Sequence, residues 1–461
     1  MVHRSEAAVL GSFALVCVFV LSLPLVTTRI YASDEVESFA WVRSWVFDRD
    51  VNFENEYQHF YDSKQVQTAS FHETFLEREN EAGRRLNFMP IGTAILWLPF
   101  YGAGHLAAIA TGAPADGFSA PYVAAVAYGS AIYGFLAVVL SLGIARRLVG
   151  HGLAASLAIW IGTPLLFYMY VAPPMSHACS AFAVSLFLWT WLHVRERWTF
   201  RGVVVLGLTG ALMAMVREQD VFFLAVPAID FIRFAFRRRL VLRDALVAAV
   251  GAASCLIAYS PQLMAYNALN GHPGPTTYVT RKMTWTAPHS LQVLFSPEHG
   301  LFAWTPLALL GIAGLVLLAL GRVPMAARES RWLAVLLLVS FALQVYVNGS
   351  VESWTVAGSF GQRRFVAITP LLVAGLASLA VAWSRLVRQR WLHAVAVLVV
   401  AAGIWWNVGL MIQFGLNRMD RQRLTLRDNM WTTFVVLPAD APGIVWRYLT
   451  NRESFYGLPH Q

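Results

Sequence analysis

The stretch AAVLGSFALVCVFVLSLPLVTTRIYASDE, residues 7–35, joins an apolar run to an acidic pair directly behind it. A helix rises 1.5 Å per residue, so the run 7–26 is long enough to cross about 30 Å of hydrocarbon. Asp34 and Glu35 then stand where the chain leaves lipid and meets water. We therefore expect a membrane helix followed at once by polar chemistry on one face of the membrane.

The composition of the whole chain agrees with this start. Of its 461 residues, 57% are hydrophobic and only 13% are charged, which is more apolar surface than a soluble core buries. Because backbone polar groups cannot face lipid unpaired, the spanning segments must be helices. The sequence predicts an all-α fold, a polytopic transmembrane helix bundle that forms one domain over residues 1–461, with 413–461 as a short tail.

Eleven apolar runs are predicted to span the membrane. Besides the first, they lie near 121–145, 153–172, 175–192, 203–217, 220–235, 243–263, 301–320, 332–347, 365–383 and 392–412. The net charge of +9 comes largely from arginines in the short connections between such runs. That pattern sets topology and does not indicate nucleic-acid binding.

Basic and arginine-poor connections alternate along the chain. The basic ones lie at 146–147, 195–201, 233–243, 322–331 and 385–390, and short basic loops stay in the cytoplasm. The alternation holds only if the apolar piece 88–110, which Pro90 and Pro99 interrupt, returns to its starting side as a juxtamembrane or re-entrant segment. Residues 29–110 then form a large first outer loop with this segment. The polar connections expected on the outer face are 29–87, 217–220, 266–300 and 348–364.

The first outer loop is rich in carboxylates and aromatic side chains. Its acids include Asp34, Glu35, Asp48, Asp50, Glu54 and Glu56. A carboxylate at the membrane surface can take a proton from an acceptor hydroxyl as that oxygen attacks a sugar carbon, which is general base catalysis. We take Asp34 as the candidate base and Glu35 as its catalytic neighbour. The alternative is that both simply cap a helix beginning near Val36.

Several basic residues are candidates for binding an anionic substrate. Arg217 interrupts otherwise apolar sequence, where an ionisable group suggests function; a plain turn with Arg217 paired to Glu218 or Asp220 is the alternative. Two further pairs could meet a phosphate near the headgroups through paired N–H donors, although snorkelling to ordinary lipid explains them equally. These pairs are Arg281 with Lys282 and Arg363 with Arg364, and Arg43 and Glu56 complete the candidate binding residues.

The sequence contains no pattern typical of a cofactor site. Its histidines lack the spacing of a metal site such as HExxH, and neither a Walker A motif nor a dinucleotide fingerprint is present. We therefore predict no cofactor and no metal, and a donor carried by lipid rather than by a nucleotide. Membrane lipids are expected partners, and nucleic acid is not.

Four segments resemble the GT-C superfamily of integral membrane glycosyltransferases, especially bacterial relatives of protein O-mannosyltransferases and the lipid A aminoarabinose transferase. They are SDE at 33–35, MPIGTAILWLPFY at 89–101, LFSPEHGLFAWTP at 294–306 and WTVAGSFGQRRF at 354–365. The paired prolines of the mannosyltransferases are absent, and only Pro90 remains. The likeness spans most of the chain and bears on membership more than on the substrate.

The resemblance implies transfer of a sugar, hexosyl or pentosyl, from a polyprenyl-phosphate carrier. The acceptor would be an envelope glycan, lipid or protein hydroxyl on the periplasmic or extracellular side of a bacterial inner membrane. Asp34 would be the base of an inverting reaction, and Arg217 and Arg363 would meet the charge on the leaving phosphate. Some members, the oligosaccharyl transferases, use a metal.

Two other classes of function stay open. A transporter or flippase of a lipid-linked sugar would also place charges and broken helices in the membrane, but most ionisable residues here fall in loops at one face and no inverted repeat is visible. A non-catalytic scaffold for envelope assembly would use the acidic loop to bind a partner. Accumulation of substrate in sealed vesicles favours the first, and full activity of an Asp34→Ala variant in complementation favours the second.

Overall fold

The computed structural model describes residues 2–66, 68–239, 241–323, 328–356 and 358–455. Over these residues the chain is all-α, as predicted: it forms twenty α-helices, and the pairing of Glu79 with Arg85 is an isolated antiparallel bridge. The chain divides into two compact units. The first comprises Met1–Ile144 and Tyr168–Met283, and the second comprises Ala145–Phe167 and Thr284–Gln461.

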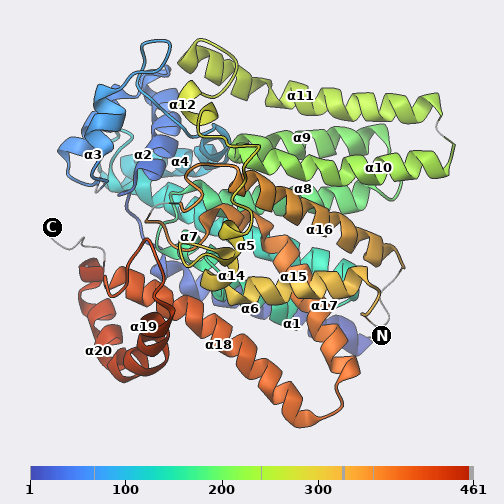
Figure 1. The fold of residues 1–461 in the computed structure, drawn as a ribbon. Helices are drawn as coiled ribbons and strands as arrows, with labels where there is room; N and C mark the ends of the chain where they lie inside the picture. The colour runs from blue at the N-terminus through green and yellow to red at the C-terminus, as the bar shows by residue number, and fades with distance from the viewer. Residues whose placement is uncertain (1, 67, 240, 324–327, 357, 456–461) are drawn as a thin grey trace. The chain divides into compact units, whose positions relative to one another are not determined.

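The first unit is built on long helices, and a polar segment that contains α2 and α3 is inserted between α1 and α4. Its helices are α1 (Val2–Ser22), α2 (Ser33–Arg43), α3 (Glu54–Asp62), α4 (Gly92–Thr111), α5 (Ala120–Val149) as far as Ile144, the end of α7 (Leu165–Tyr170), α8 (Ser176–Val194), α9 (Phe200–Val216), α10 (Ala225–Arg237), α11 (Leu242–Asn270) and α12 (Thr277–Thr280). Helix α9 packs on both α8 and α11 (Figure 1). Gly207 permits the contact with α11, because a Cβ there would lie 2.8 Å from the backbone nitrogen of Cys255.

The polar inserted segment lies at one end of this unit. Trp41 of α2 donates its indole N–H to the carbonyl of Met89 at 2.8 Å. Two residues on, the N–H of Ile91 binds the side chain of Gln262 in α11 at 2.9 Å. We call this end, where α2 meets the approach to α4 and the last turns of α9 and α11, the α2 end.

The opposite end of the first unit carries basic connections. Arg195, which follows α8, pairs with Asp230 of α10 at 2.8 Å. Since α8 and α10 end here, and α9 and α11 begin here, the connections 195–201 and 233–243 both belong to this end. The arginine-rich connections of this unit thus lie at the end opposite α2, as charge alternation requires.

The second unit has a core of two parallel helices. Its helices are α6 (Leu153–Ile161), α13 (Gln292–Phe295), α14 (Leu301–Trp304), α15 (Pro306–Ala319), α16 (Arg328–Gly349), α17 (Thr369–Leu386), α18 (Arg390–Gly415), α19 (Leu426–Trp431) and α20 (Leu437–Thr450). A Cβ on Gly314 of α15 would lie 1.9 Å from the carbonyl oxygen of Gly375 in α17, and a Cβ on Gly375 would lie 1.8 Å from that of Gly311. Such small residues are typical of close helix packing in membranes.

Within the described residues, seven helices are long and apolar enough to cross a membrane, which indicates an integral membrane protein. They include α4 and the helices that cover six of the predicted runs, namely 121–145, 175–192, 243–263, 332–347, 365–383 and 392–412. Three further runs, at 7–26, 203–217 and 301–320, match shorter apolar helices. The last two differ from expectation: 153–172 is split into α6 and α7, and 220–235 begins as a 3₁₀ turn before α10.

Helix α4 departs in one respect from the expected interrupted segment. It is continuous from Gly92 to Thr111 with Pro99 inside it, so this proline does not break the helix. By length and composition α4 could span a membrane. Its contacts, however, lie along the first half of α5: Trp97 binds Ser130 at 2.8 Å, and a Cβ on Gly104 would touch Ala125. These contacts place α4 beside the first half of α5.

Candidate active site at the α2 end of the first unit

The acidic pair opens helix α2, which begins at Ser33 rather than near Val36. Glu35 is the third residue of the helix, and its Oε2 accepts hydrogen bonds from the N–H groups of Tyr31 at 2.8 Å and Ala32 at 3.1 Å. This is the reach-back half of a capping box. The arrangement favours the capping alternative for Glu35, whose side chain is fully buried.

Burial dominates the electrostatics of Glu35. Removal from water raises the pKa of its carboxyl to about 7, against the lowering effects of the two backbone donors and of Arg29. Its Oε1 is buried and has no hydrogen-bond partner among the described residues. A proton on this carboxyl is therefore tolerated near neutral pH, and the group stays out of reach of an acceptor substrate.

Glu35→Gln is expected to change the pH dependence of stability. The carboxyl has an ordinary pKa of 4.5 and a folded pKa of about 7, so the folded state holds its proton longer and stability falls as pH rises through that window. Glutamine imitates the protonated form. The melting temperature of the variant should match that of the parent near pH 4.5 and exceed it at pH 8. At pH 8 the free energy of unfolding of the variant should be larger by on the order of 3 kcal/mol. Glu73→Gln, which changes an exposed carboxylate, is the control, and an equal effect of both substitutions would contradict the argument.

Asp34 occupies a different environment from Glu35. Its side chain is half-buried at the first turn of α2, while its own carbonyl accepts from the hydroxyl of Ser38 at 2.9 Å. Since Glu35 supplies the bonds that begin the helix, helix capping does not require the carboxylate of Asp34. The two neighbours predicted to act together are thus separated by the structure into a buried cap and a more accessible acid.

Arg217 lies where α9 ends, in extended backbone between α9 and a 3₁₀ turn at Glu218–Leu224. Its Nη1 donates to the hydroxyl of Ser176 at 3.0 Å and reaches Nδ1 of His177 at 3.1 Å. A guanidinium can only donate, so Nδ1 is the unprotonated ring nitrogen. These contacts fix Arg217 on the first turn of α8.

A chain of contacts brings Arg217 and α2 to the same end of the unit. The N–H of Phe88 binds the carboxylate of Glu37 in α2 at 2.5 Å. Four residues later, a Cβ on Gly92 would collide with the backbone of Met215 and Val216, so the start of α4 lies directly on the residues before Arg217. The α2 end therefore holds both the candidate base and one candidate cation.

The exposed pair Arg281 and Lys282 belongs to the first unit as well. Lys282 places its ammonium 5.9 Å from the ring centre of Phe88, next to the segment that binds α2. The preceding helix α12 is held by Glu81, which accepts from the N–H of Thr277 at 2.8 Å; such bonds lower the pKa of Glu81 to about 2. Lys282 is thus brought near the approach to α4.

Arg43 and Glu56 bind each other. Arg43 Nη1 lies 3.0 Å from Oε1 of Glu56, whose side chain is fully buried, and the same nitrogen meets Asp48. The guanidinium also stacks over Phe118 at 4.5 Å. This pair ties α2 to α3, which is a supporting arrangement rather than an open binding site.

Arg363 and Arg364 lie in the second unit, at the start of a 3₁₀ turn, Arg363–Ile368. Arg364 donates to the hydroxyl of Ser353 at 3.1 Å. The two motifs 294–306 and 354–365 meet here, because Nε2 of the buried His299 binds the carbonyl of Ser359 at 2.8 Å. The site as predicted thus divides into one group in each unit.

Sequence reasoning missed the residues that hold Arg217. Ser176 and His177 follow two prolines in the stretch PPMSH at 173–177, a break in apolar sequence that could have signalled them. Among the described residues, no group of three or more histidine, cysteine or acidic side chains could hold a metal ion. What the α2 end offers chemically is an accessible carboxylate and a fixed guanidinium in a setting of buried helices.

The comparisons with known proteins add no identity to this geometry. No protein-family model matches the chain, and no curated protein is significantly similar to it.

Proposed function

We propose that this protein is a GT-C-like membrane glycosyltransferase that moves a sugar from a polyprenyl-phosphate carrier to an envelope acceptor. The observation that carries the proposal is the division of roles at the start of α2. Glu35 is buried and caps the helix, whereas Asp34 beside it is half-buried and not required for that task. An acid placed so, at a polar end of a helix bundle, suits proton removal from an incoming hydroxyl.

The reaction needs three events at neighbouring atoms. The acceptor oxygen forms a bond to the anomeric carbon, the bond from that carbon to the phosphate oxygen breaks, and the hydroxyl proton passes to Asp34. Inversion follows if attack and departure occur on opposite faces of the sugar. The phosphate leaves with added negative charge, which Arg217, held by Ser176 and His177, would stabilise.

The topology that goes with this proposal has eleven crossings. Helix α4 then stays on the outer side as a juxtamembrane or re-entrant helix, which its contacts with the first half of α5 support. The α2 end faces the periplasm or the exterior of a bacterial inner membrane, and the basic connections face the cytoplasm. The acceptor, whether glycan, lipid or protein, arrives from the outer side.

The test is a transfer assay with purified full-length protein in lipid nanodiscs. Polyprenyl-phosphate sugars labelled in the sugar are supplied with an envelope extract, and the fraction that gains label is identified. Label moving into one acceptor fraction supports the proposal. A protein that instead carries intact donor across sealed vesicles, with no new glycosidic product, would refute it in favour of a transporter.

Arg217→Gln is expected to reduce the turnover rate by about a hundred-fold or more, because a fixed donor to developing charge is lost. The donor's KM should change less, since the stabilised charge develops in the transition state. Arg201→Gln, an exposed arginine at the basic end, is the matched control and should behave like the parent. Equal activity of the two variants would remove Arg217 from the mechanism.

A further inference from the structure

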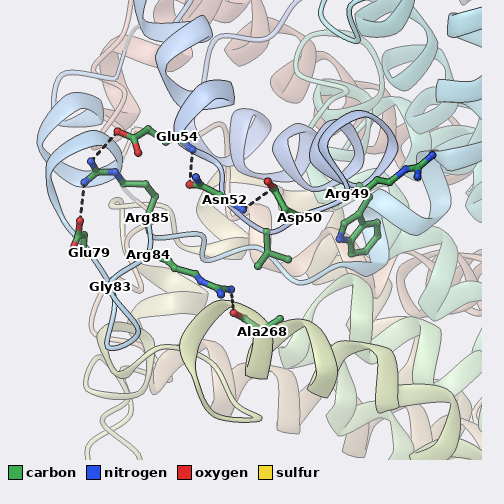
Figure 2. A pocket seen from close by; sticks show the side chains of 11 residues that line it. Arg49, Asp50, Asn52, Glu54, Glu79, Gly83, Arg84, Arg85 and Ala268 are labelled. Carbon is green, nitrogen blue, oxygen red and sulfur yellow. Dashed lines mark hydrogen bonds and ion pairs between the residues drawn. The ribbon is translucent and has the colours of Figure 1, made fainter.

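A cleft of about 630 Å³ opens in the polar inserted segment of the first unit, apart from the residues used above (Figure 2). Three segments form its walls: the turn after α2, the hairpin closed by the Glu79–Arg85 bridge, and the last turn of α11. Seven of its eleven lining residues are polar or charged, and Trp45 is the aromatic member. Such a mixture of planar polar groups and one aromatic ring is unlike the apolar pocket of a drug-like ligand.

The charges in this cleft do not all cancel locally. Arg85 forms ion pairs with Glu54 at 3.1 Å and with Glu79 at 3.7 Å, which Figure 2 marks with dashed lines. Asp50 is engaged by the hydroxyl of Ser44 at 2.8 Å. Arg84 has no carboxylate partner in the part of the chain that the structure describes. Among the described residues, Arg84 and Arg49 therefore have no acid beside them, and the carboxylate of Asp50 has no cation.

Arg84 is held in place before any ligand arrives. Its Nη1 donates to the carbonyl of Ala268, one of the last-turn carbonyls of α11 that lack a helical partner. The next carbonyl, that of Leu269, accepts from the buried Asn80 at 2.8 Å. The Oδ1 of Asn80 in turn accepts from the N–H of Arg84 at 3.0 Å. The hairpin is thus pinned to α11, and the remaining guanidinium donors stay available.

Arg49 provides a natural comparison within the same cleft. It is exposed and lines the cleft too, but Figure 2 shows its guanidinium directed away from the other lining side chains. Arg84 lies among them. Neither arginine has a carboxylate partner among the described residues, and of the two only Arg84 is placed to meet a bound group.

The cleft is connected to the candidate base through α2. Trp45 follows this helix and packs on Trp41, with ring centres 5.4 Å apart. A helix rises 1.5 Å per residue, so Asp34 and Trp45 are separated by on the order of 16 Å along the helix axis. That distance is covered by a few linked sugar rings, and binding energy gained so far from the reacting atoms can position an acceptor.

We propose that this cleft binds an acidic saccharide, with Arg84 gripping a carboxylate or phosphate on the glycan and Trp45 offering a face for a sugar ring. A guanidinium suits either anion because its paired N–H donors match two oxygens. As an acceptor subsite the cleft rests on the proposed function, and it makes the acceptor an acidic envelope glycan. Binding itself requires no catalysis.

Titration calorimetry on the full-length protein in nanodiscs tests this binding directly. The probes are trigalacturonate, its methyl ester, which has the same skeleton without charge, and inorganic phosphate. The parent should bind trigalacturonate at least tenfold more tightly than either of the others. Arg84→Gln should weaken trigalacturonate at least tenfold, Arg84→Lys should fall between, and the charge-matched Arg49→Gln should change affinity less than threefold. Melting curves establish that each variant is folded.

Several outcomes would overturn the cleft assignment. These are no binding of trigalacturonate to the parent, phosphate binding as tightly as the saccharide, or equal losses for Arg49→Gln and Arg84→Gln. The proposed function fails separately: Arg84-dependent binding without any sugar transfer would refute the transferase and leave the cleft as a saccharide site. Transfer without Arg84-dependent binding would refute the cleft alone.

Discussion

Asp34→Asn is expected to lower the rate of sugar transfer by about a hundred- to ten-thousand-fold, the range that general base catalysis contributes. The amide has nearly the same shape as the carboxylate but cannot accept the hydroxyl proton. Helix α2 should still form, because Glu35 keeps its bonds to the N–H groups of Tyr31 and Ala32. The measurement is turnover of labelled donor, together with the amount of monodisperse protein recovered from the membrane.

Asp62→Asn is the matched control for this prediction. Asp62 is an exposed acid at the end of α3 in the same polar segment, where it accepts from Gln58 at 2.7 Å. It should transfer sugar at the parental rate. If Asp34→Asn keeps parental turnover and alters only the melting temperature, Asp34 is part of the helix start, and another group must take the proton from the acceptor hydroxyl.

The fold was largely predictable because lipid imposes a local rule. Any run of about twenty apolar residues must be helical to satisfy its backbone, whatever its neighbours are. The differences arise where neighbours decide. Pro99 predicts an interruption of the segment 88–110, yet α4 continues through it. In the run 153–172, the turn around Gly162 separates α6 from α7, which a hydropathy pattern alone passes over.

The site was less predictable because its roles depend on registers and on distant pairs. A cap formed by the acidic pair is one of the alternatives that the sequence leaves open. Only the register of a helix that starts at Ser33 assigns that role to Glu35, its third residue, which reaches back to cap the helix. The contact of Arg84 with Ala268 joins residues 184 positions apart. No local pattern indicates such a pairing, whereas the acidity of the first outer loop was plain from composition.

Arg43 and Glu56, both predicted as binding residues, lead to a prediction about stability instead. Arg43→Met should lower the free energy of unfolding by about 3–5 kcal/mol, the usual result of leaving a buried charge without its partner. Glu56 has no exposed side-chain surface, and its Oε2 has no hydrogen-bond partner among the described residues. The loss of Arg43 therefore leaves its carboxylate with no compensation.

The pH dependence separates this explanation from a simple packing defect. Burial raises the pKa of Glu56 to about 7 even beside Arg43, whose hydrogen bond lowers it. Without the arginine the folded pKa rises further, so the folded state keeps its proton to higher pH and its stability falls further as pH increases. Arg43→Met should therefore be much closer to the parent at pH 5 than at pH 8 in thermal unfolding.

Adding Glu56→Gln to Arg43→Met removes the unpaired charge and should recover most of the loss at pH 8. The free-energy changes of the two single variants will then not add up to that of the double variant, as expected for residues in direct contact. A destabilisation that is equal at both pH values, or additive in the double variant, would mean that Arg43 acts through its stacking on Phe118. In that case the ion pair would contribute little to joining α2 and α3.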